Sequence, residues 1–113
     1  MATARFVQTG NAIDYTPDAD VSAGDVVVQN DLVGVAKLDI KADALGALAV
    51  TGVFDFPKAA GVDTGIDAGL QVYWDEADQE AKTDDEAGAN KLIGKTVAAA
   101  GDDDETVRVR LSQ

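Results

Sequence analysis

The sequence has no histidine and no cysteine among its 113 residues, and these two absences exclude several classes of enzyme. Without cysteine the chain has no disulfide and no thiolate nucleophile. Without histidine it has no imidazole base and lacks the commonest metal ligand. Ser-His-Asp, Cys-His and histidine-metal catalysis are therefore excluded.

Basic side chains are also scarce. Nine lysines and arginines stand against 21 acidic residues, which gives a formal net charge of -12 and a pI near 4.1. Proteins bind duplex nucleic acids largely by placing Lys and Arg against phosphates. A chain with this charge repels phosphates, so the composition predicts no direct binding to nucleic acid.

Long hydrophobic runs are missing as well. No stretch approaches the ~18 apolar residues of a transmembrane helix, and residues 1–10 lack the charged and apolar regions of a secretory signal. We therefore expect a soluble chain, made in the cytoplasm, with no membrane partner. The length corresponds to a single domain, residues 1–113, and a hydrophobic content of 46% suffices for one thin core.

The apolar residues that are present recur mostly with a period of two, which predicts an all-β fold. Residues 48–56 and 106–112 alternate most clearly, and Arg108 and Arg110 share the outward face of the second segment. Further strands are expected at residues 4–9, 26–29, 32–40, 70–74 and 92–99. Short strands with turn residues between them predict a small single-domain β-barrel or sandwich with long loops.

Three glycines lie inside these strand patterns: Gly34, Gly52 and Gly94. A missing side chain within a strand indicates a bulge, a tight bend or a close approach of another backbone. Pro57 has no N–H for a ladder and is expected to end the strand before it.

The most acidic segments are interpreted as surface structure. Residues 75–90 are expected to form a hairpin excursion, and residues 102–105 a solvated turn before the last strand. The acidic residues of 102–105 are consecutive, which does not fit the alternating ligands of a calcium loop. The triplet 63–65, Asp-Thr-Gly, matches that of aspartic proteases, but the chain has one copy and is too short for two lobes. We predict a turn there and no metal site.

Four other residues are candidates for contacts with partners. Trp74 is compatible with a core position, an interface or a ligand platform. Arg5, Arg108 and Arg110 are the only arginines, and they either face an acidic surface of another subunit or protein or balance the charge of residues 102–105.

The ordered set of these segments resembles the capsid cement, or decoration, proteins of tailed viruses, a family long catalogued as a domain of unknown function. The resemblance covers nearly the whole chain. It rests on Phe6-Val7-Gln8, Gly10-Asn11, Ile13-Asp14-Tyr15-Thr16, Ala23-Gly24-Asp25-Val26-Val27, Leu32-Val33-Gly34-Val35-Ala36, Asp39-Ile40, Gly46-Ala47-Leu48-Ala49-Val50, Gly52-Val53-Phe54, Pro57-Lys58, Val72-Tyr73-Trp74-Asp75, Leu92-Ile93-Gly94 and Val107-Arg108-Val109-Arg110-Leu111.

The resemblance implies a structural, non-enzymatic virion protein without cofactors. It would form a homo-oligomer, expected to be a trimer, on the outer surface of the assembled head, where it would bind the major capsid protein and stabilise contacts between capsomers. Residues 1–8 are expected to act as an N-terminal arm. The capsid or subunit interface is expected to include Arg5, Phe6, Val7, Trp74, Arg108 and Arg110.

Two alternatives stay open: an extracellular β-module that binds carbohydrate or calcium, and another virion β-domain from a tail or baseplate. The 17 Asp and 4 Glu residues also resemble the composition of proteins from high-salt cytoplasm. This composition suggests the virus of a halophilic host.

Overall fold

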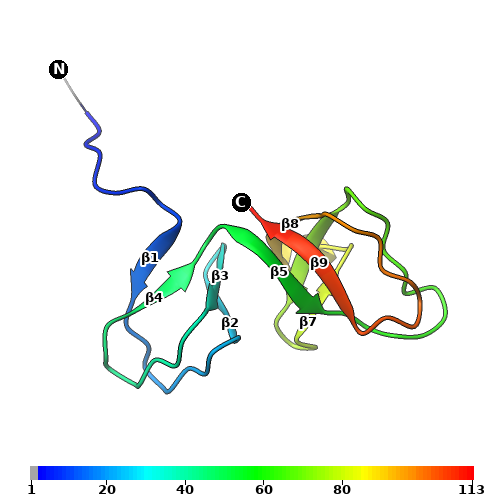
Figure 1. Cartoon of the computed structure of the whole chain (residues 1–113), viewed down its shortest axis with the longest axis horizontal. Helices are drawn as coiled ribbons and strands as arrows, with labels where there is room; N and C mark the ends of the chain where they lie inside the picture. The colour runs from blue at the N-terminus through cyan, green and yellow to red at the C-terminus, as the bar shows by residue number, and fades with distance from the viewer. Residues whose placement is uncertain (1–2) are drawn as a thin grey trace.

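The computed structural model describes residues 3–113 as two antiparallel sheets that lie side by side along the long axis of the molecule (Figure 1). The first sheet has the order β1 (Ala12–Tyr15), β4 (Gly46–Ala49), β3 (Leu32–Ala36) and β2 (Val26–Gln29). The second has the order β5 (Gly52–Pro57), β9 (Thr106–Leu111), β8 (Lys91–Thr96), β6 (Gln71–Asp75) and β7 (Glu80–Lys82). The predicted all-β class is confirmed, and of the two architectures the sandwich fits.

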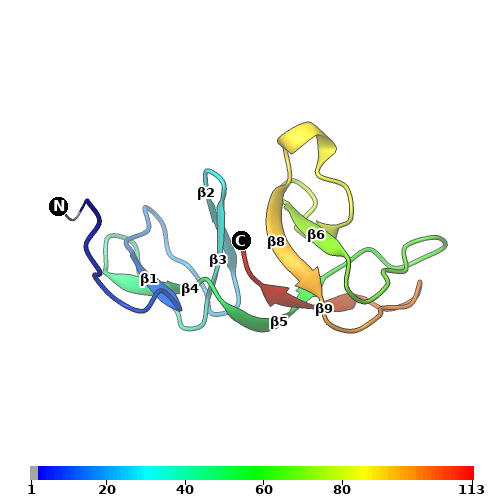
Figure 2. The same ribbon diagram turned by 90° about the horizontal axis from the view of Figure 1, so that it is seen from above.

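The β2–β3 hairpin is the part of the first sheet that lies next to the second sheet (Figure 2). It has apolar residues on both faces. Val33 and Val35 belong to the larger core, whereas Ala36 belongs to a smaller core within the first sheet. Val28 and Val27 of β2 divide between the two cores in the same way. Burial on both faces explains why residues 26–28 are three consecutive valines instead of an alternating pattern.

The larger core lies under the second sheet. It is formed by inward-facing residues of β5, β6, β7, β8 and β9 and of two loops, together with Val33 and Val35 of β3. The buried residues contributed by the second sheet and its loops are Phe56, Ile66, Val72, Trp74, Ala81, Ile93, Ala100, Val107, Val109 and Leu111.

The prediction of one strand over residues 48–56 is wrong. The segment forms β4 and β5, which belong to different sheets, and the chain passes from one sheet to the other at Gly52, where φ is 120°. This backbone conformation is strained for a residue with a Cβ, so the glycine permits the change of direction. Leu48 accordingly lies in the smaller core and Phe56 in the larger one.

Most other strands are confirmed with shifted ends. The predicted strand 26–29 is β2, and residues 106–112 contain β9. The strands predicted at 32–40, 70–74 and 92–99 correspond to β3, β6 and β8, but β3 and β8 end at Ala36 and Thr96. As predicted, β5 ends at Pro57, which lies on an edge strand of the second sheet.

Two short strands, β1 and β7, were not predicted, and β7 lies in the polar segment. That segment, residues 75–90, contains the turn and the second strand of a hairpin whose first strand is β6, and the 3-10 turn η1 (Glu86–Gly88) follows. The expected hairpin is thus present but begins before residue 75. The strand predicted at residues 4–9 is wrong, since these residues have no regular secondary structure. Within residues 3–113, no helix is long and apolar enough to cross a membrane.

Gly94 is a position of close backbone approach. A Cβ atom on Gly94 would lie 2.0 Å from the carbonyl oxygen of Arg110 on β9. The pairing of β6 with β8 also shifts register between Val72 and Tyr73, next to the partner position of Gly94. The predicted bulge or close approach is therefore confirmed at this glycine.

Two long loops, residues 58–70 and 97–105, are joined by the buried side chain of Lys58. Its Nζ donates hydrogen bonds to the carbonyl oxygens of Ala59, Gly101 and Asp104, at 2.7, 3.0 and 2.8 Å. Ile66 and Ala100 add a reciprocal pair of backbone hydrogen bonds. Although Lys58 is only 5% exposed, its ammonium group is thus well satisfied and positions both loops.

Candidate binding surfaces

The N-terminal arm carries three of the expected interface residues in exposed positions. Phe6 and Val7 are 82% and 76% exposed, and Arg5 is also exposed. The arm, residues 3–11, runs away from the first sheet (Figure 1), and a side-chain hydrogen bond from Gln8 to the carbonyl oxygen of Ala12 ties its base to β1. Residues 1 and 2 of the expected arm lie outside the described residues.

The outer face of the second sheet forms a second candidate surface. Strand pairing places Val53, Arg110, Lys95 and Gln71 in one row across β5, β9, β8 and β6. Lys95 and Arg110 are therefore direct cross-strand neighbours, and both are exposed. Like charges in this position repel each other and destabilise a sheet.

Neither cation of this pair is neutralised within the described part of the chain. No carboxylate of residues 3–113 lies within ion-pair distance of Lys95 or Arg110. A hollow of about 160 Å³ opens beside them and is also lined by Gln71, Leu92, Gly94 and Ser112. In a chain with a net charge of -12, this row is a local concentration of positive charge.

Arg108 has a different environment from Arg110, although the two share the outward face of β9 as predicted. Its Nε and Nη2 donate to the two carboxylate oxygens of Asp55 on β5, at 2.9 and 3.2 Å. These hydrogen bonds lower the pKa of Asp55 and raise that of Arg108. Arg108 thus balances Asp55 and not the acidic turn 102–105, while Arg5 lies on the arm, apart from both arginines of β9.

Trp74 occupies the core position among its three predicted alternatives. It is 2% exposed, and its ring lies 6.0 Å from that of Phe56 in an edge-to-face arrangement. The indole N–H donates to the carboxylate of Glu76 at 2.9 Å. With its apolar surface buried and its polar group satisfied, Trp74 presents no face to a sugar or to a partner protein.

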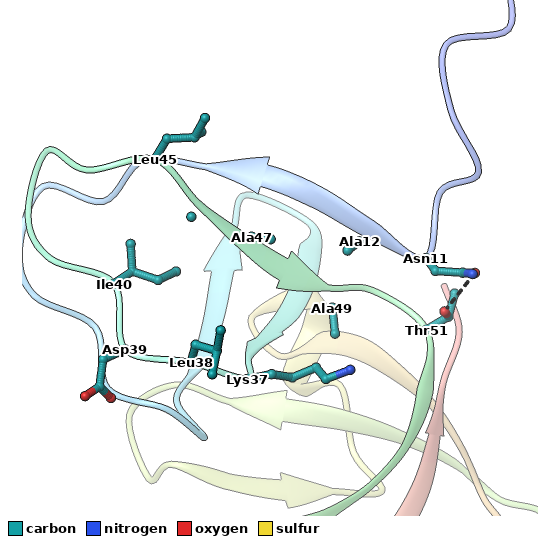
Figure 3. Close-up of a pocket in the computed structure, with 11 residues that line it drawn as sticks. Asn11, Ala12, Lys37, Leu38, Asp39, Ile40, Leu45, Ala47, Ala49 and Thr51 are labelled. Atoms are coloured by element: carbon teal, nitrogen blue, oxygen red, sulfur yellow. Dashed lines mark hydrogen bonds between the residues drawn. The ribbon is translucent and has the colours of Figure 1, made fainter.

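A third candidate surface is an apolar groove on the outer face of β1 and β4, in the first sheet (Figure 3). The groove has a volume of about 590 Å³, and Ala12, Ala47 and Ala49 are its strand residues. Leu38 and Leu45 flank it and are 77% and 71% exposed. Asn11, at the base of the arm, lines the groove together with Thr51, Lys37, Asp39, Ile40 and Gly46.

The acidic segments are organised by local hydrogen bonds. Lys82 forms ion pairs with Asp75, at 2.7 Å, and with Asp78. The hydrogen bond that Lys82 donates to Asp75 is the largest cause of a lowered Asp75 pKa, and the hydrogen bond from the Asp78 N–H is the next largest. The hydrogen bonds that Lys82 donates to the carboxylates of Asp75 and Asp78 raise its own pKa. Among residues 3–113, no three acidic side chains form a group that could hold a metal ion.

The other acidic motifs are turns. Residues 102–105 are exposed and precede β9, as predicted. In the triplet 63–65, the Thr64 hydroxyl donates to the carbonyl oxygen of Asp102 at 2.7 Å, and the Gly65 N–H donates to the Asp102 carboxylate at 2.8 Å. The triplet therefore connects the two long loops, in agreement with the predicted turn.

Sequence reasoning missed Lys95, Leu38 and Leu45 as surface residues. Lys95 lies in a segment that was correctly expected to be a strand, and its exposed side chain alternates with the buried Thr96. Ile93, two positions earlier, is buried instead of exposed because the pairing of β6 with β8 shifts register there. The position of Lys95 opposite Arg110 depends on strand pairing, which the sequence does not show. Leu38 lay within the predicted strand 32–40, but β3 ends before it, at Ala36.

Comparison with known proteins gives one family. A family model described as phage cement protein matches residues 7–111, which is nearly the whole chain. No match was found among the curated proteins or the solved structures.

Proposed function

The chain belongs to the phage cement protein family, and from this premise we propose that it binds the outside of the assembled head and stabilises contacts between capsomers. The family is a structural virion family, and we infer that the chain works by binding and without catalysis. Its partner would be the major capsid protein, and its own assembly a homotrimer.

The cross-strand pair Lys95 and Arg110 is the observation that supports a capsid-binding face. A rigid sheet that holds two unneutralised cations next to each other gains free energy when an anionic partner covers them. Val53, which is 55% exposed, adds an apolar contact to the same row. We propose that this row faces carboxylates of the capsid protein, with Arg108 contributing at its edge despite its ion pair with Asp55.

Because many copies would bind one head, a modest affinity of each copy for the capsid protein would be sufficient. Each oligomer would contact several capsid subunits at once, so that the second and third contacts form at a high effective concentration. The remaining surface, which is strongly acidic, would face the solvent. We propose a halophilic host, because such a surface suits a medium of high salt.

Binding to heads that lack cement protein tests this function. Purified chain is added to heads assembled from the major capsid protein of the same virus, and bound copies are measured by co-sedimentation. We expect saturable binding of the unaltered chain and a rise of at least roughly tenfold in Kd for the double variant Lys95→Glu, Arg110→Glu. Heads with bound chain are also expected to resist heat at temperatures that open bare heads.

The matched control is Lys41→Glu with Lys91→Glu, which changes the net charge equally at positions outside both the Lys95–Arg110 row and the groove of the first sheet. Circular dichroism checks that both double variants keep the β fold. Equal head binding by the two double variants would refute the assignment of the binding face. Absence of any head binding by the unaltered chain would refute the proposed function itself.

A further inference from the structure

The apolar groove on the first sheet exposes apolar side chains to water, which is unfavourable. Leu38 and Leu45 are mostly exposed on either side of it, and the strand residues between them are alanines (Figure 3). An exposed apolar patch with small residues at its centre has space for a large side chain and gains free energy when one fills it.

The same chain carries an unpartnered apolar segment. Residues 4–9 form no strand and pair with no strand among residues 3–113, and Phe6 is 82% exposed. A segment without secondary structure or partners of its own can bind a second protein surface in extended form. Donor segment and acceptor groove are therefore both present on every copy.

The geometry separates the arm from its own groove. The arm leaves β1 at Asn11, whose side chain accepts a hydrogen bond from Thr51 at 3.2 Å at one end of the groove. From there the chain runs away from the groove and not across it (Figure 3). The groove is left open in this arrangement, and Phe6 is carried outward, where a neighbouring copy can receive it.

Charge favours a second copy as the occupant. Residues 3–13 contain no acidic side chain, and their one charged residue is Arg5. Asp14 is the register partner of Ala47 on the grooved face of β1 and β4, and it forms no ion pair within residues 3–113. An arm that places Phe6 on the alanines can therefore bring Arg5 towards a free carboxylate.

We infer that the groove receives the N-terminal arm of a second copy of this chain, with Phe6 seated between Leu38 and Leu45. Donation of one arm and acceptance of another is a head-to-tail contact, which closes into a ring when the rotation between copies allows it. The inference deepens the homo-oligomer of the proposed function and rests on it.

Engineered cysteines test the contact, because the chain has no cysteine of its own. Phe6→Cys and Leu45→Cys are placed in separate chains, one of which carries a tag that changes its size. The two are mixed, oxidised mildly without heads and resolved on a non-reducing gel. We expect the mixed disulfide to be the main product. Phe6→Cys mixed with Val62→Cys is the control, since Val62 is 86% exposed on a loop of the other sheet.

Sedimentation provides a second measurement. Burial of one Phe side chain is worth about 1.5–3 kcal/mol, so Phe6→Ala should weaken self-association roughly ten- to hundredfold, whereas Val62→Ala should not change it. A mixed disulfide no stronger than the Val62 control would overturn the inference. So would a monomer at every concentration, or a chain with both Phe6→Cys and Leu45→Cys that cross-links only to itself.

These results are independent of the capsid assay. Heads that bind the chain while the arm fails to cross-link would reject arm exchange and leave the cement function intact. Cross-linked arms on a chain that does not bind heads would support arm exchange and reject the cement function.

Discussion

The side-chain amide of Gln113 pairs with the backbone of Val33 in both directions. Its Nε2 donates to the Val33 carbonyl oxygen at 2.7 Å, and its Oε1 accepts from the Val33 N–H at 2.7 Å. β4 pairs with β3 only at Val35 and Ala36. On the side of β3 that faces β4, Val33 therefore has no strand partner, although β2 pairs with it on the other side. The amide takes the place of the missing strand and connects the two sheets.

Replacement of Gln113 by Ala should therefore destabilise the protein by about 1–3 kcal/mol, because two buried backbone groups lose their partners. Gln113→Glu should destabilise the protein at least as much, since a carboxylate cannot donate a hydrogen bond to the Val33 carbonyl oxygen. Urea unfolding measures both effects. Ser112→Ala is the control, because Ser112 uses only its backbone N–H, which donates to Ile93. Equal midpoints for Gln113→Ala and the control would contradict this role.

Lys58→Met should loosen the two long loops together. Methionine preserves most of the buried chain length but leaves the carbonyl groups of Ala59, Gly101 and Asp104 without a donor. We expect a loss of about 2 kcal/mol or more in the free energy of unfolding and faster hydrogen exchange at the Gly61 amide, which is bonded to Asp102. Lys41→Met, at an exposed lysine, should change neither measurement.

Asp75 should make stability depend on acid pH. Its pKa is lowered from the ordinary value of 3.8, chiefly by Lys82, so the native state binds this proton less readily than the unfolded state does. Its stabilisation is therefore complete above the ordinary value and is lost as pH falls through the lowered one. Thermal unfolding from pH ~6 to ~2 should show a weaker acid dependence for Asp75→Asn than for the unaltered chain.

An NMR titration of the side-chain carboxyl groups checks the cause. Lys82→Gln should raise the pKa of Asp75 towards 3.8. Asp55→Asn should leave it unchanged, because Asp55 on β5 pairs with Arg108 on β9, and β8 separates these two strands from β6, which carries Asp75. If Lys82→Gln does not move the pKa of Asp75, the ion pair is not its cause.

Salt should stabilise the fold well beyond simple screening if the host is halophilic. At ~1 M salt the screening length is already about 3 Å, so repulsion among the exposed carboxylates is largely removed there. We expect Tm to continue rising between ~1 M and ~3 M KCl for a salt-adapted surface. A Tm that levels off below ~1 M would indicate ordinary screening and would count against the halophilic host.

Predictions of the candidate site succeeded where neighbouring residues alone decide the structure. Alternation along residues 106–112 correctly placed Arg108 and Arg110 on one outward face, and the acidic turn before them was also expected. The different environments of the two arginines could not be predicted, because Asp55 and Lys95 reach them from other strands. The sequence likewise left three interpretations of Trp74, because its burial depends on packing against Phe56 from another strand.

The sequence by itself determined the all-β class, most strand positions, the family and the chemistries that the chain lacks, because strand alternation and turn residues act over a few positions. Only the tertiary structure decided that residues 48–56 divide between two sheets at Gly52, that Lys95 lies opposite Arg110 and that Leu38 and Leu45 border a groove. These features depend on strand order and register, which are set by pairing between segments far apart in the chain.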